Sequence, residues 1–181
     1  MMKRTIENPV IKDTITFLQT SKESGGKITD LVLTLMPKGG NILHYHPYAE
    51  KFTAIDGELG LILGKKKKRI ILKPGESCTV PSMELHNFFN PGDHEIKFGA
   101  QIEPGNERFE YMLRIAYGLA ADGLTDKTSK PKSLTHTAII ICMSGVCAPG
   151  LLTLMLPIFK IIAKKAKRNG EEQKLIDRYC I

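Results

Sequence analysis

The sequence has few cysteines, and their spacing is not that of a structural zinc site. Its four cysteines, Cys78, Cys142, Cys147 and Cys180, form no Cys-x-x-Cys pair. The opening residues, MMKRTIENPVIKD, also lack the apolar segment of a secretory signal. Both absences favour a reduced, cytoplasmic setting, and a position peripheral to a membrane is the alternative.

The composition is not that of a disordered or fibrous protein. Hydrophobic residues make up 42% of the 181 residues and charged residues 25%, which is typical of a globular protein. A chain of this length accommodates one domain with a sizeable extension.

Positive charge is in excess, with a formal net charge of +7, and it gathers at residues 65–69 and 160–168. The first cluster, KKKKR, follows Gly64 and has no aromatic residue among its lysines that would stack on a base. A solvated hairpin turn is the simpler interpretation, so we expect no nucleic-acid partner.

Residues 28–103 are a series of short apolar or alternating runs separated by turn residues, which is typical of a β-sandwich or β-barrel. The turns fall at Asp56-Gly57, Gly64, Pro74-Gly75 and Pro91-Gly92-Asp93. Residues 107–124 have helical spacing. The pattern predicts a mainly β protein with an N-terminal strand or arm at 1–27, a barrel at 28–104 and a helical extension at 105–181.

The heptapeptide HYHPYAE, residues 44–50, contains most of a metal site. On a strand over residues 42–46, His44 and His46 would point the same way, and Pro47 would end the strand so that Glu50 returns beside them. Two imidazoles and a carboxylate suit a divalent transition metal ion. His86, at the start of a later strand, is a candidate fourth ligand, and a satisfied set of buried polar groups is the alternative.

These residues resemble the two motifs of the cupin superfamily. The first, H-x-H-x3-E-x6-G, is matched by His44, His46, Glu50 and Gly57; the second, G-x5-P-x-G-x2-H-x3-N, is matched by Gly75, Pro81, His86 and Asn90. Met83 replaces the motif's second glycine, and Lys38 stands where a glycine usually precedes the first histidine. The resemblance implies a jelly-roll barrel holding one divalent metal ion, Fe, Mn, Ni, Cu or Zn, on His44, His46, Glu50 and His86.

Alternation along the strands predicts what surrounds the ion. If Glu50 and His86 point inward, so do Phe52, Phe88 and Asn90. With Tyr48 and Cys78 these residues would line a pocket for a small, largely apolar substrate, although they could equally just fill the barrel.

Two functions are compatible with such a site. The resemblance to quercetinase-like cupins implies an oxygenase in which Glu50 is both a ligand and the catalytic base. The alternative is a non-catalytic module that binds or senses a ligand, with the extension making contact with a partner.

Residues 138–159 contain no charged residue, but Pro149-Gly150 and Pro157 interrupt them. We therefore expect an apolar hairpin of two helices, at about 131–147 and 151–168, with Leu151, Leu154, Met155, Ile158 and Ile162 forming one stripe of the second. The hairpin would pack on the barrel or on a second subunit, lie at a membrane surface, or span a membrane. We expect a homodimer.

Overall fold

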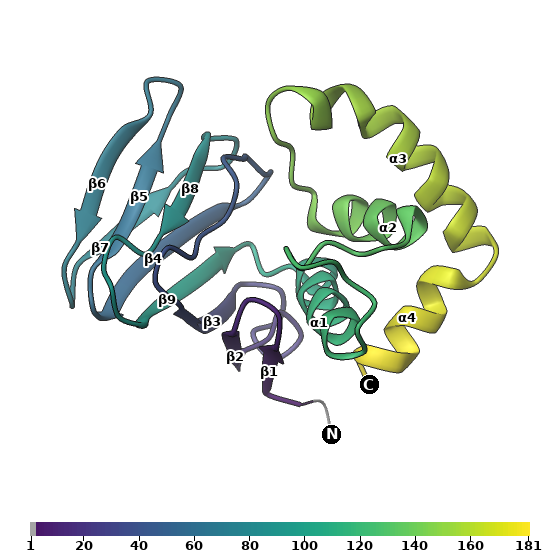
Figure 1. Ribbon diagram of the computed structural model, residues 1–181, viewed down its shortest axis with the longest axis horizontal. Helices are drawn as coiled ribbons and strands as arrows, with labels where there is room; N and C mark the ends of the chain where they lie inside the picture. The colour runs from purple at the N-terminus through teal and green to yellow at the C-terminus, as the bar shows by residue number, and fades with distance from the viewer. Residues whose placement is uncertain (1–2) are drawn as a thin grey trace.

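The structure is a computed structural model that describes residues 3–181, except for the side chain of Leu152. In this part of the chain, nine strands precede four helices. Figure 1 shows the strands gathered into one body and the helices beside it. The predicted mainly β fold with a C-terminal helical extension is confirmed.

The strands form two antiparallel sheets. The larger has the order β1-β2-β3-β9-β4-β7 and the smaller β6-β5-β8. The strands are β1 (Thr5–Asn8), β2 (Asp13–Gln19), β3 (Thr29–Leu35), β4 (Ala49–Asp56), β5 (Leu59–Leu63), β6 (Lys68–Leu72), β7 (Ser77–Val80), β8 (His86–Phe89) and β9 (Ile96–Glu103). Because β2 pairs directly with β3, the large sheet continues across the boundary expected at residue 28.

Alternating burial turns one face of each sheet toward a shared core. In β4, Glu50, Phe52 and Ala54 are buried while Lys51 between them is exposed, as period-two geometry requires. The core joins residues of both sheets, namely Phe17, Leu31, Phe52, Leu59, Leu61, Leu72 and Phe98. The inward face of β4 therefore carries Glu50 into the space between the sheets.

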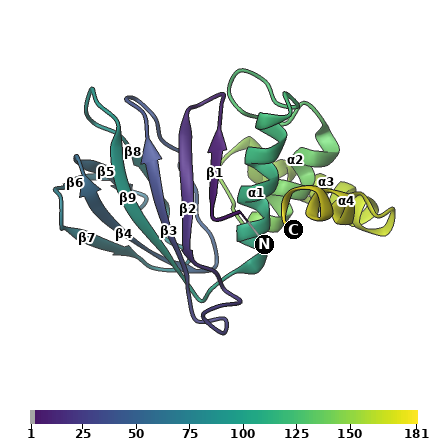
Figure 2. The same ribbon diagram turned by 90° about the horizontal axis from the view of Figure 1, so that it is seen from below.

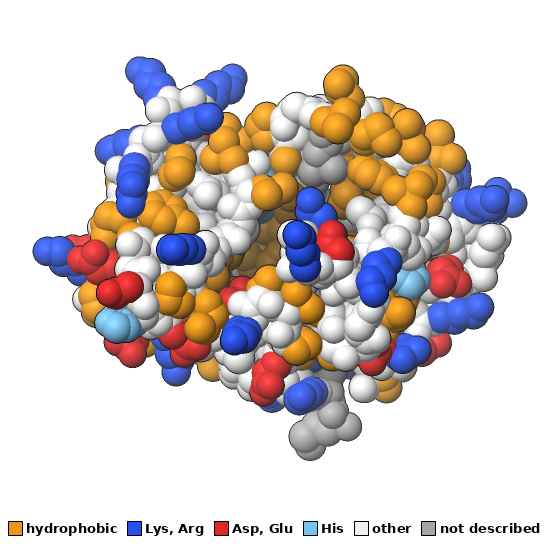
Figure 3. Space-filling view, viewed as in Figure 1, with side chains coloured by type: hydrophobic (Ala, Val, Ile, Leu, Met, Phe, Trp, Pro, Cys, Tyr) orange, Lys and Arg blue, Asp and Glu red, His pale blue; other side chains and the backbone are white. Residues whose placement is uncertain are grey.

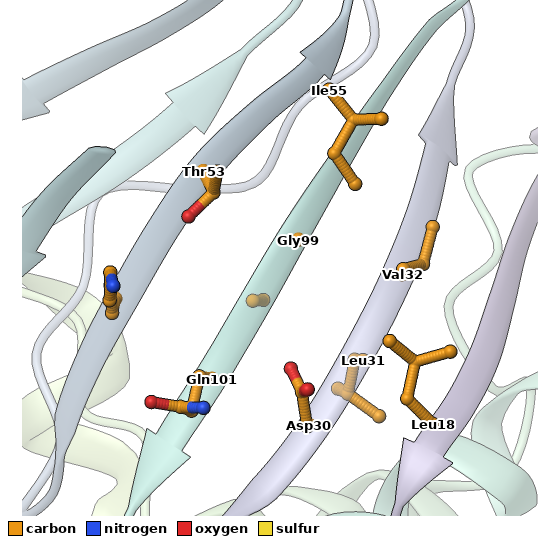
Figure 4. A pocket seen from close by; sticks show the side chains of 10 residues that line it. Leu18, Asp30, Leu31, Val32, Thr53, Ile55, Gly99 and Gln101 are labelled. Atoms are coloured by element: carbon orange, nitrogen blue, oxygen red, sulfur yellow. The ribbon is translucent and has the colours of Figure 1, made fainter. Parts of the chain in front are cut away.

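The outer face of the large sheet has a hollow of about 240 Å³ over β2, β3, β9 and β4, where Gly99 contributes no side chain (Figure 4). Lys51, Thr53 and Ile55 line it from β4. These residues alternate with Glu50 along the strand, so the hollow lies on the opposite face of the sheet from Glu50.

Residues 42–46 do not form the expected strand. Only His44 and Tyr45 make β-type contacts there, as isolated bridges to His86 and Cys147. Both His44 and His46 are nevertheless buried. The segment is a loop whose shape depends on distant partners.

The helices are α1 (Glu107–Ala121), α2 (Leu134–Ser144), α3 (Leu151–Arg168) and α4 (Glu171–Tyr179). Asn106 caps α1 by accepting a hydrogen bond from the Phe109 amide, and α1 runs beside β1 (Figure 2). The Ser133 hydroxyl caps α2, which ends at Gly145 with φ of 65°. The predicted helix at 151–168 matches α3, which continues through Pro157, whereas α4 was not foreseen as a separate helix.

Part of the predicted stripe of α3 packs inward, because Met155 and Ile162 contact the cluster of Ala138, Phe159 and Ala163. Phe159, Ala163 and Ala166 are buried, whereas Leu151 and Leu154 are 74% and 75% exposed. Among the described residues, no helix combines the length and apolar character needed to cross a membrane.

Candidate metal centre

Four potential ligands from separate parts of the barrel converge at one point. His44 and His46 lie in the loop before β4, Glu50 is the second residue of β4, and His86 is the first residue of β8. Backbone hydrogen bonds of 2.9 and 2.7 Å join His44 to His86 in both directions. The ligand atoms of all four residues lie within 4.8 Å of one another, and each residue is at most 7% exposed.

The backbone fixes the orientation of all three imidazoles. Nδ1 of His44 lies 2.8 Å from the Ile42 carbonyl, that of His46 lies 2.9 Å from the Tyr48 carbonyl, and that of His86 lies 2.8 Å from the Glu84 carbonyl. A carbonyl oxygen only accepts, so each Nδ1 carries the proton and donates it. The Nε2 atom of each ring is left with a free lone pair, as in a metal-binding histidine.

These Nε2 atoms face a carboxylate oxygen, which is also an acceptor. Glu50 Oε2 lies 3.1 Å from His46 Nε2 and 3.3 Å from His86 Nε2. Acceptors that face one another in a buried site repel unless a positive species lies among them. Additional protons would satisfy some of the contacts, whereas one divalent ion would satisfy all four ligands. The donor set therefore fits a transition metal ion.

Burial and neighbouring groups set the charge of the site. Burial lowers the pKa of His44 to about 4, because the charged imidazolium loses its hydration. For Glu50, burial alone would raise the pKa, but in the absence of a metal ion protonated rings of His46 and His86 would donate to it, outweigh burial and lower the pKa overall. A neutral His44 beside a negative Glu50 is the protonation state that a metal cation requires.

Residues 31–100 match the family model described as Cupin domain. This segment contains all four converging ligands. These residues form a cupin domain. A comparison with curated protein sequences found no match.

Several solved structures are similar to this chain at low sequence identity. The polyketide cyclase RemF from Streptomyces resistomycificus is 20% identical, with a TM-score of 0.45 over 56% of this chain and 66% of its own. An RmlC-like cupin from Shewanella frigidimarina is 16% identical, with a TM-score of 0.49 over 57% and 86%. A predicted oxalate decarboxylase from Thermotoga maritima is 22% identical, with a TM-score of 0.48 over 57% and 92%.

Three of the expected pocket residues lie inside the cupin domain around an aromatic cluster. Phe52 is fully buried, and its ring centroid is 5.8 Å from that of Phe88 and 6.1 Å from that of His86. Phe88 is also 5.1 Å from Phe98, and Cys78 is the β7 partner of Phe52 in the sheet register. Phe52 and Phe88 therefore pack in the core next to His86.

Asn90 and Tyr48 make contacts of another kind. Asn90 donates to the carbonyls of Leu35 and His94 and accepts from the Gly92 amide, so its amide holds the turn before β9. Tyr48 is 3% exposed and does not lie at an open rim. Its ring stacks on His46 at 3.8 Å between centroids and 13° between planes.

The helical extension contacts the ligand loop directly. The Tyr48 hydroxyl donates to the Ser144 carbonyl at 3.2 Å, at the end of α2, where helix carbonyls lack partners within the helix. Tyr45 and Cys147 exchange two backbone hydrogen bonds of 2.8 and 2.9 Å. Sequence reasoning missed these contacts because a backbone carbonyl or amide gives no signal in the residue types.

Proposed function

We propose that this protein is a mononuclear metal-dependent enzyme, oxygenase-like, that acts on a small, largely apolar organic molecule. The observation that supports it is the orientation of the three imidazoles. Each donates Nδ1–H to a backbone carbonyl, and Nε2 of His46 and of His86 faces the Glu50 carboxylate. A site built only for packing has no need of four inward-facing acceptors.

His44, His46, Glu50 and His86 would hold the ion. A redox-active metal bound there would supply a Lewis acid with coordination positions left for oxygen and substrate. With Nε2 of each imidazole bound to the ion and Glu50 ionised, the protein ligands would carry a total charge of minus one.

Glu50 is also the best placed proton acceptor. Its Oε2 atom faces His46 and His86, whereas Oε1 makes no hydrogen bond within residues 3–181. The side chain keeps 10% of its surface exposed. Oε1 is therefore the atom that would take a proton from a bound substrate, for example one acidified by an adjacent carbonyl.

The surroundings favour an apolar substrate. Phe52, Phe88 and Cys78 lie beside the ligands. Among the described residues the one buried lysine or arginine side chain is that of Arg114, which lies over the Phe17 ring and donates to the Lys3 carbonyl. A phosphorylated substrate would require such a cation beside the ligands.

The first test is metal analysis of protein purified without a polyhistidine tag. We expect about one transition metal ion per chain, and a much lower content for His86→Gln. His94→Gln is the matched control, because His94 is exposed and pairs with Asp93 away from the site. Equal metal content in both variants and the wild type would contradict the ligand assignment.

The second test is oxygen uptake by protein loaded anaerobically with Fe, Mn, Ni or Cu. Flavonols and β-diketones are suitable first substrates because they are small, apolar and easily deprotonated. We expect turnover with one metal and its loss in Glu50→Gln. Consumption of oxygen that is unchanged by that substitution would contradict the role of Glu50.

A non-catalytic ligand-binding or sensing module is the second candidate. The packing of Phe52, Phe88 and Phe98 against one another favours a module whose ligand is the metal ion itself, since these rings fill part of the space beside the ligands. One metal ion per chain together with no turnover on either substrate class would favour this candidate over the enzyme.

A further inference from the structure

The outward side of α3 is apolar and exposed. Leu151, Leu154, Ile158 and Ile161 are 74%, 75%, 47% and 70% exposed. Their spacing places them in one stripe along the helix, which we call the outer stripe. Hydrophobic side chains gather over α3 at the upper right of Figure 3.

The fold does not need the outer stripe for its own core. α3 is already fixed on its other side, where Phe159 and Ala163 pack with Ala138 of α2 and Ala166 packs with a cluster that includes α1 and α4. Beside the stripe, a groove of about 500 Å³ runs between Ile161 and Leu134, and Leu134 is itself 59% exposed. The groove is also lined by Ser133, Thr135, Lys165, Asn169 and Glu171, so the exposed Leu134 lies across a groove of mixed character from the stripe.

The stripe is bordered by positive charge. α3 contains no acidic residue, and its five basic residues are Lys160, Lys164, Lys165, Lys167 and Arg168. All five are exposed, and none forms an ion pair within the described part of the chain. Their charge is free to act on an external partner.

We propose that the outer stripe docks on an anionic lipid surface, with α3 lying in the plane of the membrane interface. A helix with a row of large aliphatic side chains and adjacent lysines has the two features that such binding requires. The aliphatic side chains enter the boundary between headgroups and acyl chains, and the lysines stay at the level of the phosphates.

Charge favours lipid over a second copy of the chain. A second copy docked through the same stripe would present the same five basic residues and no acidic residue from α3. The lysines would then lose hydration without gaining a counter-charge from that helix. An anionic membrane supplies the counter-charge over its whole surface.

Co-sedimentation with lipid vesicles tests the proposal, and it does not depend on the metal chemistry. The full-length protein is mixed with vesicles of phosphatidylcholine alone or of phosphatidylcholine with phosphatidylglycerol. We expect binding to the anionic vesicles, weaker binding to the neutral ones, and a decrease as salt is added.

Two matched pairs of variants locate the binding surface. Lys164→Ala with Lys165→Ala should weaken binding about 25-fold, because each lysine near an anionic surface contributes about fivefold. Lys65→Ala with Lys66→Ala changes the net charge equally but lies in the exposed hairpin before β6, so it should change binding less than about twofold.

The apolar part is tested in the same way. Leu154→Gln should weaken binding about tenfold or more, since an apolar side chain leaves water on insertion. Leu18→Gln, at a 55% exposed position of β2, is the control and should not change it. Thermal unfolding and metal content check that each variant is folded.

Three results would overturn the proposal. The first is no preference of the wild type for anionic vesicles. The second is an equal loss of binding in the hairpin pair and the α3 pair. The third is a dimer in light scattering that Leu154→Gln converts to a monomer while vesicle binding is absent, because the stripe would then be the interface between two copies.

Discussion

Replacing Glu50 by glutamine should separate the stability of the empty site from its affinity for metal. Glutamine has nearly the same shape as glutamate, but it is neutral and its amide can donate a hydrogen bond. In the wild type, Glu50 Oε2 faces Nε2 of His46 at 3.1 Å and of His86 at 3.3 Å. A glutamine amide at that position would donate to one of these lone pairs, so the metal-free variant should be at least as stable as the wild type.

The metal-loaded proteins should differ in the opposite direction. At a metal concentration about 100 times Kd, binding stabilises the wild type by about 2.7 kcal/mol. A variant that binds about 100-fold more weakly, the upper end of what even an outer-shell change produces, gains only about 0.4 kcal/mol at the same concentration. For a chain of this size each kcal/mol shifts Tm by about 2 to 4 °C, so we expect a rise of about 5 to 11 °C in the wild type and about 1 °C in Glu50→Gln.

Differential scanning fluorimetry with and without a chelator measures both effects. Glu58→Gln is the matched control, because Glu58 is exposed in the turn between β4 and β5. It should respond to metal as the wild type does. An equal rise in Tm for Glu50→Gln and the wild type, or no rise in the wild type with any of the five metals, would refute the assignment of these residues as ligands.

Further predictions concern the framework. Tyr48→Phe should lose about 1 to 2 kcal/mol of unfolding free energy, because the Ser144 carbonyl loses its donor; metal titration should show nearly unchanged affinity, since the stacked ring remains. Burial raises the pKa of Asp13 to about 6, so the folded protein loses stability as pH rises from about 4 to about 6. In urea titrations, Asp13→Asn should therefore be more stable than the wild type by about 1 to 2 kcal/mol near pH 7 and equally stable below about pH 4. Gly57→Ala should lose about 2 to 3 kcal/mol of unfolding free energy in the same assay, because φ is +76° and an added Cβ would lie 2.5 Å from the Ile96 side chain. Gly75→Ala should lose only about 1 kcal/mol, because its φ is also positive, at +89°, but the space around it is open. Equal losses for the two glycine variants would contradict the packing argument.

The metal centre could be predicted from the sequence because its geometry is largely local. Alternation in β4 places Glu50 and Phe52 on one face whatever the rest of the chain does. His86 opens β8 directly after a turn, so its direction depends on a few neighbouring residues. Both motifs therefore carry most of the information that brings the four ligands together.

The loop before β4 could not be predicted in this way. The alternation of His44 and His46 suggested a strand, but a strand needs continuous partners, and the structure offers only isolated bridges to His86 and Cys147. The partner of Tyr45 lies about 100 residues further along the chain. Both functional side chains point as predicted, although the reason is these backbone bridges and not a regular strand.

What covers α3 was left open by the sequence for a related reason. Hydrophobicity places Leu151, Leu154, Met155, Ile158 and Ile162 in one stripe but does not say what lies against it. In the structure Met155 and Ile162 pack against the buried Phe159 and Ala163, whereas Leu151 and Leu154 stay exposed. A pattern of hydrophobic residues alone therefore does not tell which side of a helix is buried. Small side chains such as Ala163 and Ala166 can be buried while large ones such as Leu151 and Leu154 stay exposed.

The contacts of the extension make the two proposals physically connected, although each is tested separately. Gly145 to Gly150 link the end of α2, where Ser144 accepts a hydrogen bond from Tyr48, to the start of α3. Within that link, Cys147 is bound through its backbone to Tyr45, which lies between the two ligands of the loop. A force that moved α3 at a lipid surface would therefore act on the loop that carries His44 and His46. All four ligands belong to the barrel, so such a movement would leave the ligand set unchanged and would alter the metal site only through the directions of these two side chains.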